Sequence, residues 1–353
     1  MEQIDIYSYL YPEIAITKPI RLIELFAGYG SQAMALKRIG AKFEHYRVIE
    51  FDKFAIESYN TVHDTAFPVL DITKVHAEDL GIERTDEFTY LLTYSFPCTD
   101  LSLTGKQAGM KKGSGTRSGL LWEVERLFKE IVVAKKELPQ ILLMENVPQV
   151  HSKKNIDDFN KWIDFLESIG FRNYWKDLNS KDYGIPQSRN RTFMVSILGN
   201  YNYKFPKKIK LKKKTKDLLE KTVDEKCYRN NVEDTKLIKR LIENGQIDES
   251  TTVEAVTTDG KVRKIANTLL AGYYKTNMSE FNSVNAVIEK RDEFKIRKLT
   301  PRECGRLMGV SDEDITKMER VNSKSQLYKQ LGNSIVVNVM CELFKQLNIN
   351  QEE

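Results

Sequence analysis

Apolar and polar positions alternate in blocks along the first two hundred residues. Short apolar runs that are typical of buried strands occupy 22–26, 46–49, 67–70, 88–96, 141–144, 174–178 and 192–198. Stretches with the spacing of an amphipathic helix lie between them, at 32–38, 53–60, 120–136 and 156–169. Strands that alternate with helices in this way predict an α/β fold with a doubly wound, mostly parallel sheet.

The pattern changes after Gly199. Strands become hard to place, and turns rich in Asn, Asp and Gly continue to about Asp292. We therefore expect three segments, which are a first domain over 1–199, a separate small domain over 200–295, and a return of 296–353 to the first domain.

Regular structure is expected again from Thr300 onward. Thr300 is placed to cap a helix that Pro301 opens, and Glu303 completes a capping box. A last strand–helix pair is expected around 332–334.

Composition narrows the class of protein. The 353 residues are 41% hydrophobic and 10% aromatic, which describes a globular chain with a core. No apolar run reaches the roughly 20 residues that a membrane span needs, and the first residues do not form a secretory signal. The four cysteines lie far apart, so neither a disulfide framework nor a zinc site is expected. We therefore expect a cytoplasmic protein without a metal.

The net charge of +5 is unevenly distributed, because eight lysines lie between Lys204 and Lys216. Such a run is either a solvated surface or the footprint of a polyanion, and the run alone does not separate the two.

Candidate chemistry begins where the apolar run 88–96 stops at Pro97. Proline favours extended geometry before it, so Cys98 is expected at the carboxyl edge of the sheet, where open α/β folds bind their ligands. A glycine-dotted loop over 99–118 follows. The local sequence fits a nucleophilic thiol and a small core residue equally well.

A glycine turn, Phe26 to Gly30, joins the first strand to the first helix, as a nucleotide-binding fold requires. Glu50 ends the next strand, 22 residues after Gly28, at the distance of an acid that binds ribose hydroxyls. The third glycine of the pyrophosphate fingerprint is missing, which argues against NAD or FAD. S-adenosylmethionine fits this pattern best.

Two further motifs carry polar groups at strand ends. Glu145 and Asn146 follow a purely apolar strand, where burial should raise the pKa of the carboxyl group. Gln187, Arg189 and Arg191 share one face of an extended segment, and fixed guanidinium groups suit a carbonyl or a phosphate. A structural glutamate and ordinary surface arginines remain as the alternatives.

Together these motifs resemble, in order and spacing, those of the DNA (cytosine-5) methyltransferases of bacteria and phages. The segments that carry the resemblance are 26–30, 97–98, 145–147, 187–191, 297–303 and 332–334. The resemblance covers about 1–200 and 296–353, and it implies a Rossmann-like methyltransferase fold. The family inserts a small target-recognition domain where this chain has 200–295.

The resemblance also implies a role for each catalytic residue. Cys98 would attack C6 of cytosine, and Glu145 would bind N3 and the exocyclic amine. Asn146 would order the pocket, Arg191 would contact O2 of the base, and Arg189 would support the strand. Ser95 and Thr99 stand where the family usually has glycine and glutamine, which affects the loop rather than the thiol.

The cofactor implied by the resemblance is S-adenosylmethionine. Its pocket would be lined by Phe26, Gly28, Tyr29, Gly30, Glu50, Phe51, Asp71, Ile72, Pro97, Leu120, Asn333 and Ser334. The loop 99–118, with Lys106, Lys111, Lys112 and Arg117, would close over DNA.

The implied function is C5 methylation of a cytosine flipped out of a specific duplex DNA sequence, by a monomer in a bacterial or phage-infected cell. Restriction–modification, a phage role and a regulatory role all stay open as the setting. A tRNA methyltransferase and a non-catalytic DNA-binding relative remain as alternatives. A zinc deaminase is excluded, because Leu101 occupies the position of its second cysteine ligand.

Overall fold

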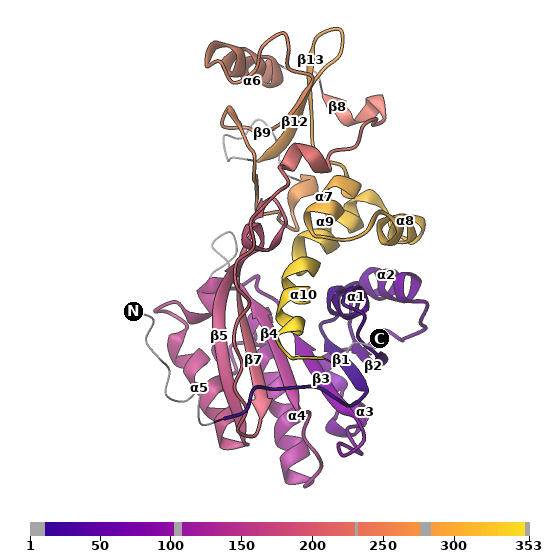
Figure 1. The fold of residues 1–353 in the computed structure, drawn as a ribbon, viewed down its shortest axis with the longest axis vertical. Helices are drawn as coiled ribbons and strands as arrows, with labels where there is room; N and C mark the ends of the chain where they lie inside the picture. Colours follow the sequence, from indigo (N-terminus) through magenta and orange to yellow (C-terminus); the bar gives the residue numbers. More distant parts are fainter. Residues whose placement is uncertain (1–10, 102–107, 230–231, 276–283, 350–353) are drawn as a thin grey trace. The chain divides into compact units, whose positions relative to one another are not determined.

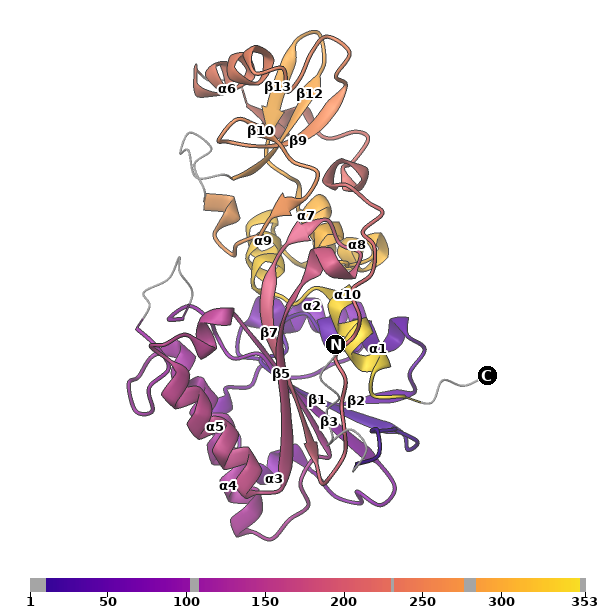
Figure 2. The same cartoon turned by 60° about the vertical axis from the view of Figure 1, so that its left-hand side comes forward.

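The computed structural model describes residues 11–101, 108–229, 232–275 and 284–349 (Figures 1 and 2). The chain divides into two compact units, which are described separately below. Unit 1 consists of Met1–Leu178, Asn190–Lys207 and Val339–Glu353, and unit 2 of Asn179–Arg189 and Lys208–Asn338.

Unit 1 is built on a six-stranded sheet in the order β2-β1-β3-β4-β7-β5. The strands are β1 (Ile20–Leu25), β2 (Phe43–Ile49), β3 (Thr89–Tyr94), β4 (Ile141–Asn146), β5 (Phe171–Asn179) and β7 (Asn190–Leu198). β1 to β4 pair in parallel, and β7 runs antiparallel to β4. The sheet is therefore mixed but mostly parallel, and its parallel strands place their carboxyl ends along one edge.

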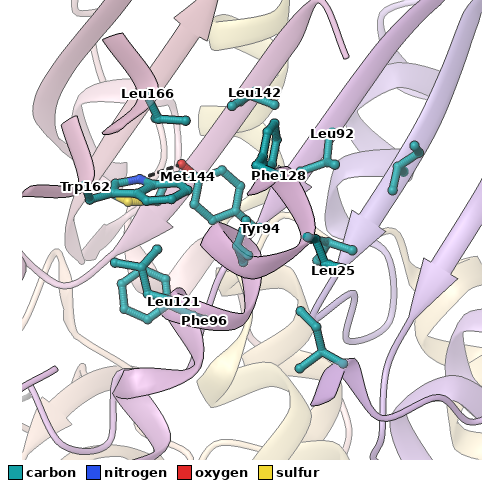
Figure 3. Packing of buried hydrophobic residues seen from close by; sticks show 14 of the residues in the cluster. Leu25, Leu92, Tyr94, Phe96, Leu121, Phe128, Leu142, Met144, Trp162 and Leu166 are labelled. Atoms are coloured by element: carbon teal, nitrogen blue, oxygen red, sulfur yellow. Dashed lines mark hydrogen bonds between the residues drawn. The ribbon is translucent and has the colours of Figure 1, made fainter. Parts of the chain in front are cut away.

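Helices cover both faces of this sheet. They are α1 (Ser31–Arg38), α2 (Lys53–His63), α3 (Ala77–Leu80), α4 (Leu121–Val133), α5 (Ile156–Ser168) and α10 (Val337–Lys345). The main core lies between the sheet and α3, α4 and α5 (Figure 3). There Trp162 packs edge-on against Tyr94 and donates from its indole N–H to the tyrosine oxygen at 3.0 Å. α1 and α2 lie on the opposite face (Figure 2).

The predictions for two elements are wrong. Residues 67–70 form no strand, because Pro68 lacks a backbone donor and the side-chain amide group of Asn60 binds both backbone groups of Phe67. The strand–helix pair expected around 332–334 is a helix pair, α9 (Lys324–Asn333) followed by α10.

Unit 2 contains a five-stranded sheet in the order β10-β9-β12-β13-β8. Its strands are β8 (Tyr228–Arg229), β9 (Val253–Thr257), β10 (Lys261–Val262), β12 (Asn285–Lys290) and β13 (Phe294–Arg297), and each pair is antiparallel. Its helices are α6 (Val232–Glu243), α7 (Pro301–Leu307), α8 (Asp312–Val321) and α9. A small core of its own lies between the sheet and α6.

The units differ in extent from the domains expected above, since residues 296–338 group with unit 2. A buried ion pair is one reason, because the guanidinium group of Arg297 binds both carboxylate oxygens of Glu303, at 2.8 and 2.7 Å. Thr300 and Glu303 also form the predicted capping box at the start of α7. The start of α7 is thereby tied to β13 of the same unit.

Candidate active site

Cys98 lies just beyond the carboxyl end of β3, as the sequence predicts. Its carbonyl oxygen accepts a hydrogen bond from the backbone N–H of Leu101 at 3.0 Å, which closes a tight turn. The side chain is partly exposed. All four cysteines lie in the described part of the chain, and none of them is in a disulfide. The partly exposed thiol therefore lies in reduced form at the edge of the sheet.

Glu145 and Asn146 are the last two residues of β4, the strand next to β3. The amide group of Asn146 donates to the carbonyl of Phe96 at 2.9 Å, and its oxygen accepts from the N–H of Val147 at 2.9 Å. Asn146 therefore holds the chain that leads to Cys98 against the end of β4.

Arg191 stands opposite this strand end, on β7. Its Nε lies 3.2 Å from Oε1 of Glu145, and both side chains are largely buried. A buried carboxylate is costly without a charged partner, so the pair fixes both groups in place. Cys98, Glu145, Asn146 and Arg191 thus belong to neighbouring strand ends of one unit.

The glycine turn follows β1 in the predicted way. Phe26, Gly28 and Gly30 all have positive φ, at 57°, 59° and 81°. The N–H of Gly28 donates to Oε2 of Glu50 at 2.9 Å, and the N–H of Asp52 donates to Oε1 at 2.8 Å. Burial raises the pKa of Glu50, while these two donors oppose that change. Glu50 thus connects the turn to the end of β2.

Apolar side chains are exposed beside Glu50. Phe51 is 66% exposed and Val69 48%, and the N–H of Leu70 donates to the Glu50 carbonyl at 2.9 Å. Large apolar groups on a surface mark a binding site when they gather around polar groups. Of the other predicted pocket residues in unit 1, Tyr29 and Ile72 are buried, Pro97 and Leu120 are partly exposed, and Asp71 caps a 3-10 turn.

The remaining predicted residues belong to unit 2. Arg189 is buried, and its guanidinium group donates to the carbonyls of Leu269, Gly332 and Ser334, at 2.9, 3.1 and 2.7 Å. Asn333 is exposed at the end of α9. Arg189 therefore ties segments that are distant in sequence within unit 2.

Gly332 allows the close approach of these segments. A Cβ at this position would lie 2.3 Å from the nitrogen of Ala271 and 2.4 Å from the carbonyl carbon of Leu270. We expect Gly332→Ala to lower the free energy of unfolding by about 3 kcal/mol, because backbone atoms must move. Chemical denaturation measures this loss. Gly272→Ala is the matched control, since nothing lies within 4 Å of its added Cβ; an equal loss in both variants would contradict the explanation.

The lysines predicted to contact DNA differ in their surroundings. Lys208 and Lys216 of the lysine run pair with Asp182 and Glu254 inside unit 2. Of the loop lysines, Lys106 lies outside the described residues. The segments 266–269 and 273–275 of the same unit bury Ala266, Leu269 and Tyr273.

Sequence reasoning missed two groups of polar residues near the site. Asp100 and Ser118 bind each other beside Cys98. Glu24 lies fully buried in β1 and accepts a hydrogen bond from the hydroxyl of Tyr59 at 2.5 Å. Only the charge of Glu24 within an apolar run could have signalled the second group.

Among the described residues, no cluster of His, Cys, Asp or Glu could hold a metal ion.

A mixed, mostly parallel sheet with a glycine turn at β1 and polar groups at the ends of β3 and β4 defines a Rossmann-like methyltransferase fold. Residues 20–348 match the model of the C-5 cytosine-specific DNA methylase family, and the chain belongs to that family. It is therefore a DNA (cytosine-5) methyltransferase.

Named relatives of similar length support this assignment. The chain is 33% identical to the type II methyltransferase M2.ScrFI of Lactococcus lactis subsp. cremoris, over 93% of this chain and 99% of that protein. It is 34% identical to the type II methyltransferase M.HhaI of Haemophilus parahaemolyticus, over 91% and 92%. The orphan methyltransferase M.SssI of Spiroplasma monobiae is 30% identical, over 92% and 96%.

Solved structures share the fold at lower identity. The Entamoeba histolytica methyltransferase EhMeth superposes with a TM-score of 0.67 at 17% identity, covering 94% of this chain and 98% of that one. The S. pombe Dnmt2 methyltransferase superposes with a TM-score of 0.64 at 21% identity, covering 93% of this chain and 98% of that one.

In the described part of the chain, no helix is long and apolar enough to cross a membrane.

Proposed function

We propose that this enzyme transfers the methyl group of S-adenosylmethionine to C5 of a cytosine flipped out of duplex DNA, through a covalent bond between Cys98 and C6. The observation that carries the proposal is the arrangement at the ends of β3 and β4. There Asn146 joins the chain before Cys98 to the strand end that holds the Glu145–Arg191 pair.

Each residue of this arrangement has a chemical task. C5 of cytosine is a poor nucleophile until a thiolate adds to C6 and places an electron pair on C5. Glu145 would bind N3 and the exocyclic amine, and Arg191 would bind O2, so that the ring accepts the negative charge. When bound, S-adenosylmethionine supplies the methyl group as an electrophile. A base then takes the C5 proton, the electron pair of that C–H bond forms the C5–C6 double bond, and the bond between C6 and Cys98 breaks to restore the thiolate.

The cofactor would lie against the glycine turn. Positive φ at Gly28 and Gly30 turns the backbone there, and a Cβ on Gly30 would lie 2.4 Å from Nε2 of His63. Glu50 would accept from the ribose hydroxyls, and exposed Phe51 would cover the adenine ring. We include Phe26, Tyr29, Asp71, Ile72, Pro97 and Leu120 of unit 1 in the proposed pocket.

Phe51→Ala should weaken cofactor binding by about 1–2 kcal/mol, roughly a 5- to 30-fold rise in Kd, because a stacked ring contact is lost. Isothermal titration calorimetry with S-adenosylmethionine measures the change. Tyr201→Ala removes another exposed aromatic side chain of unit 1, which is 39% exposed, and its Kd should match the unmodified protein. An unchanged Kd for Phe51→Ala would remove Phe51 from the pocket.

We further propose that residues 200–295 recognise the target sequence, with 1–199 and 296–353 supplying the catalytic part. Arg189 would support this recognition segment through its bond to the Leu269 carbonyl. The exposed lysines at 207, 210 and 212–214 would bind the phosphate backbone of the duplex. We expect a monomer on DNA, acting in the cytoplasm of a bacterial or phage-infected cell.

Covalent trapping tests the proposal. The protein is incubated with S-adenosylmethionine and duplex DNA that contains 5-fluorocytosine, whose C5 fluorine blocks the final elimination. A complex that survives denaturation and maps to Cys98 is expected. A stable non-covalent complex alone would support a DNA-binding relative without activity, and methyl transfer to tRNA in preference to duplex DNA would support the tRNA enzyme.

A further inference from the structure

Asp100 joins the two ends of the segment that follows Cys98. Its Oδ2 accepts hydrogen bonds from the backbone N–H groups of Arg117 and Ser118, at 2.8 and 3.3 Å. The N–H of Asp100 donates to Oγ of Ser118 at 3.3 Å. Asp100 is only 8% exposed and Ser118 is fully buried. Residues 98–101 are thereby fastened to the chain that enters α4.

The backbone of Asp100 is fixed as well. Its carbonyl accepts a hydrogen bond from the N–H of Gly109 at 2.9 Å, and the Leu101 N–H closes the turn onto the Cys98 carbonyl. The hydroxyl of Ser118 donates to the carbonyl of Pro97 at 2.7 Å. That carbonyl belongs to the peptide immediately before Cys98, so its direction constrains where the thiol points.

A purely structural explanation covers only part of these contacts. Asp100 satisfies two N–H groups at a helix start, as an ordinary cap does. However, Thr116 already caps this start, since its Oγ accepts from the N–H of Gly119 at 3.1 Å and donates to the Gly109 carbonyl at 3.1 Å. The bond from Ser118 to Pro97 satisfies no helix group. It acts on the chain that carries the nucleophile.

We propose that Asp100 and Ser118 are positioning residues, which hold the turn at Cys98 so that its thiol meets C6 of the base. The proposal rests on the function proposed for Cys98. A displacement of about 1 Å at a reacting atom can cost on the order of 100-fold in rate, so these distant bonds can matter for the chemical step.

Four variants test the proposal. Asp100→Ala and Ser118→Ala remove the bonds to the turn, and Asp100→Asn keeps an oxygen that can accept both N–H groups. Thr116→Val is the matched control, because it removes the cap without touching residues 97–101. The rate of covalent complex formation with 5-fluorocytosine DNA is measured well below each melting temperature, alongside the Kd for the duplex and for S-adenosylmethionine.

We expect Asp100→Ala and Ser118→Ala to slow complex formation at least roughly tenfold while both Kd values stay unchanged. Thr116→Val should lower the melting temperature and leave the rate near that of the unmodified protein, and Asp100→Asn should restore most of it. Unchanged rates in both alanine variants would overturn the proposal. So would equal slowing in Thr116→Val, or an Asp100→Asn variant as slow as Asp100→Ala.

Failure of the positioning role can be told apart from failure of the function proposed for Cys98. If the unmodified protein forms no covalent complex, the proposed role of Cys98 fails. Alkylation of Cys98 by iodoacetamide, followed by mass spectrometry of its peptide, then still tests the contacts. The rate should change at least about threefold in Asp100→Ala and Ser118→Ala but not in Thr116→Val; equal rates in all of them would overturn the positioning role.

Discussion

Replacing Cys98 with serine is expected to lower the rate of methyl transfer to duplex DNA by on the order of 10⁴-fold or more. A hydroxyl group at the end of β3 has a far higher pKa than a thiol, so almost none of it is ionised and able to add to C6. The measurement is transfer of a radiolabelled methyl group from S-adenosylmethionine to DNA. The same residue change should abolish trapping on 5-fluorocytosine.

The control for this variant is binding. Cys98→Ser should fold normally and keep its Kd for the cofactor, because the side chains differ little in size. Cys341 offers a matched substitution in the same unit, since its thiol is buried and lies 3.7 Å from the Ala35 carbonyl. Cys341→Ser should keep its activity per folded molecule. Undiminished labelling by Cys98→Ser would show that another group performs the chemistry.

Glu24→Gln is expected to remove a large pH dependence of stability. Complete burial in β1 raises the pKa of Glu24 from about 4.5 to about 8, although hydrogen bonds from Tyr59 and from the Ala33 N–H oppose the change. The folded state therefore holds a proton that the unfolded state has lost. Stability is fully present below pH 4.5 and falls as pH rises toward 8, by several kcal/mol at about 1.4 kcal/mol per pH unit.

The glutamine variant keeps the acceptor for Tyr59 but does not titrate. Urea unfolding at pH 5 and pH 8 should therefore show the variant gaining stability over the unmodified protein by a few kcal/mol between these values. His63 changes stability in the opposite direction, since burial lowers its pKa to about 3 and stability falls below pH 6.5. This term is common to both proteins and cancels in the comparison. A difference that stays constant with pH would show that Glu24 is ionised in the fold.

The sheet of unit 1 could be predicted because its signals are local. Buried parallel strands read as continuous apolar runs, and proline and glycine mark where they end. Pro97, Cys98 and the glycine turn therefore lie where the sequence placed them. The polar groups at the end of β4 follow from the same rule.

Other features depend on contacts that no local pattern reveals. The run 67–70 is apolar but mostly exposed, and its backbone is bound by Asn60 and Glu50 rather than by a strand. In the sheet of unit 2, β8 and β10 have only two residues each, which is too short to show alternation. The bonds of Asp100 to Arg117 and Ser118 close a loop of seventeen residues or more, and only folding brings these groups together.

The folding of unit 1 depends on residues from both ends of the chain, so it cannot be completed until translation is nearly finished. The Cys341 thiol meets the Ala35 carbonyl across 306 positions, and Ile16 bridges to Ile349. A nascent chain that has completed the six strands of the unit 1 sheet must therefore wait, with the surface that α10 will cover still exposed, while Lys208–Asn338 of unit 2 emerges from the ribosome. Contacts between residues far apart in sequence slow folding and leave aggregation-prone intermediates exposed. The yield of this enzyme in cells should therefore depend on chaperones and on growth temperature.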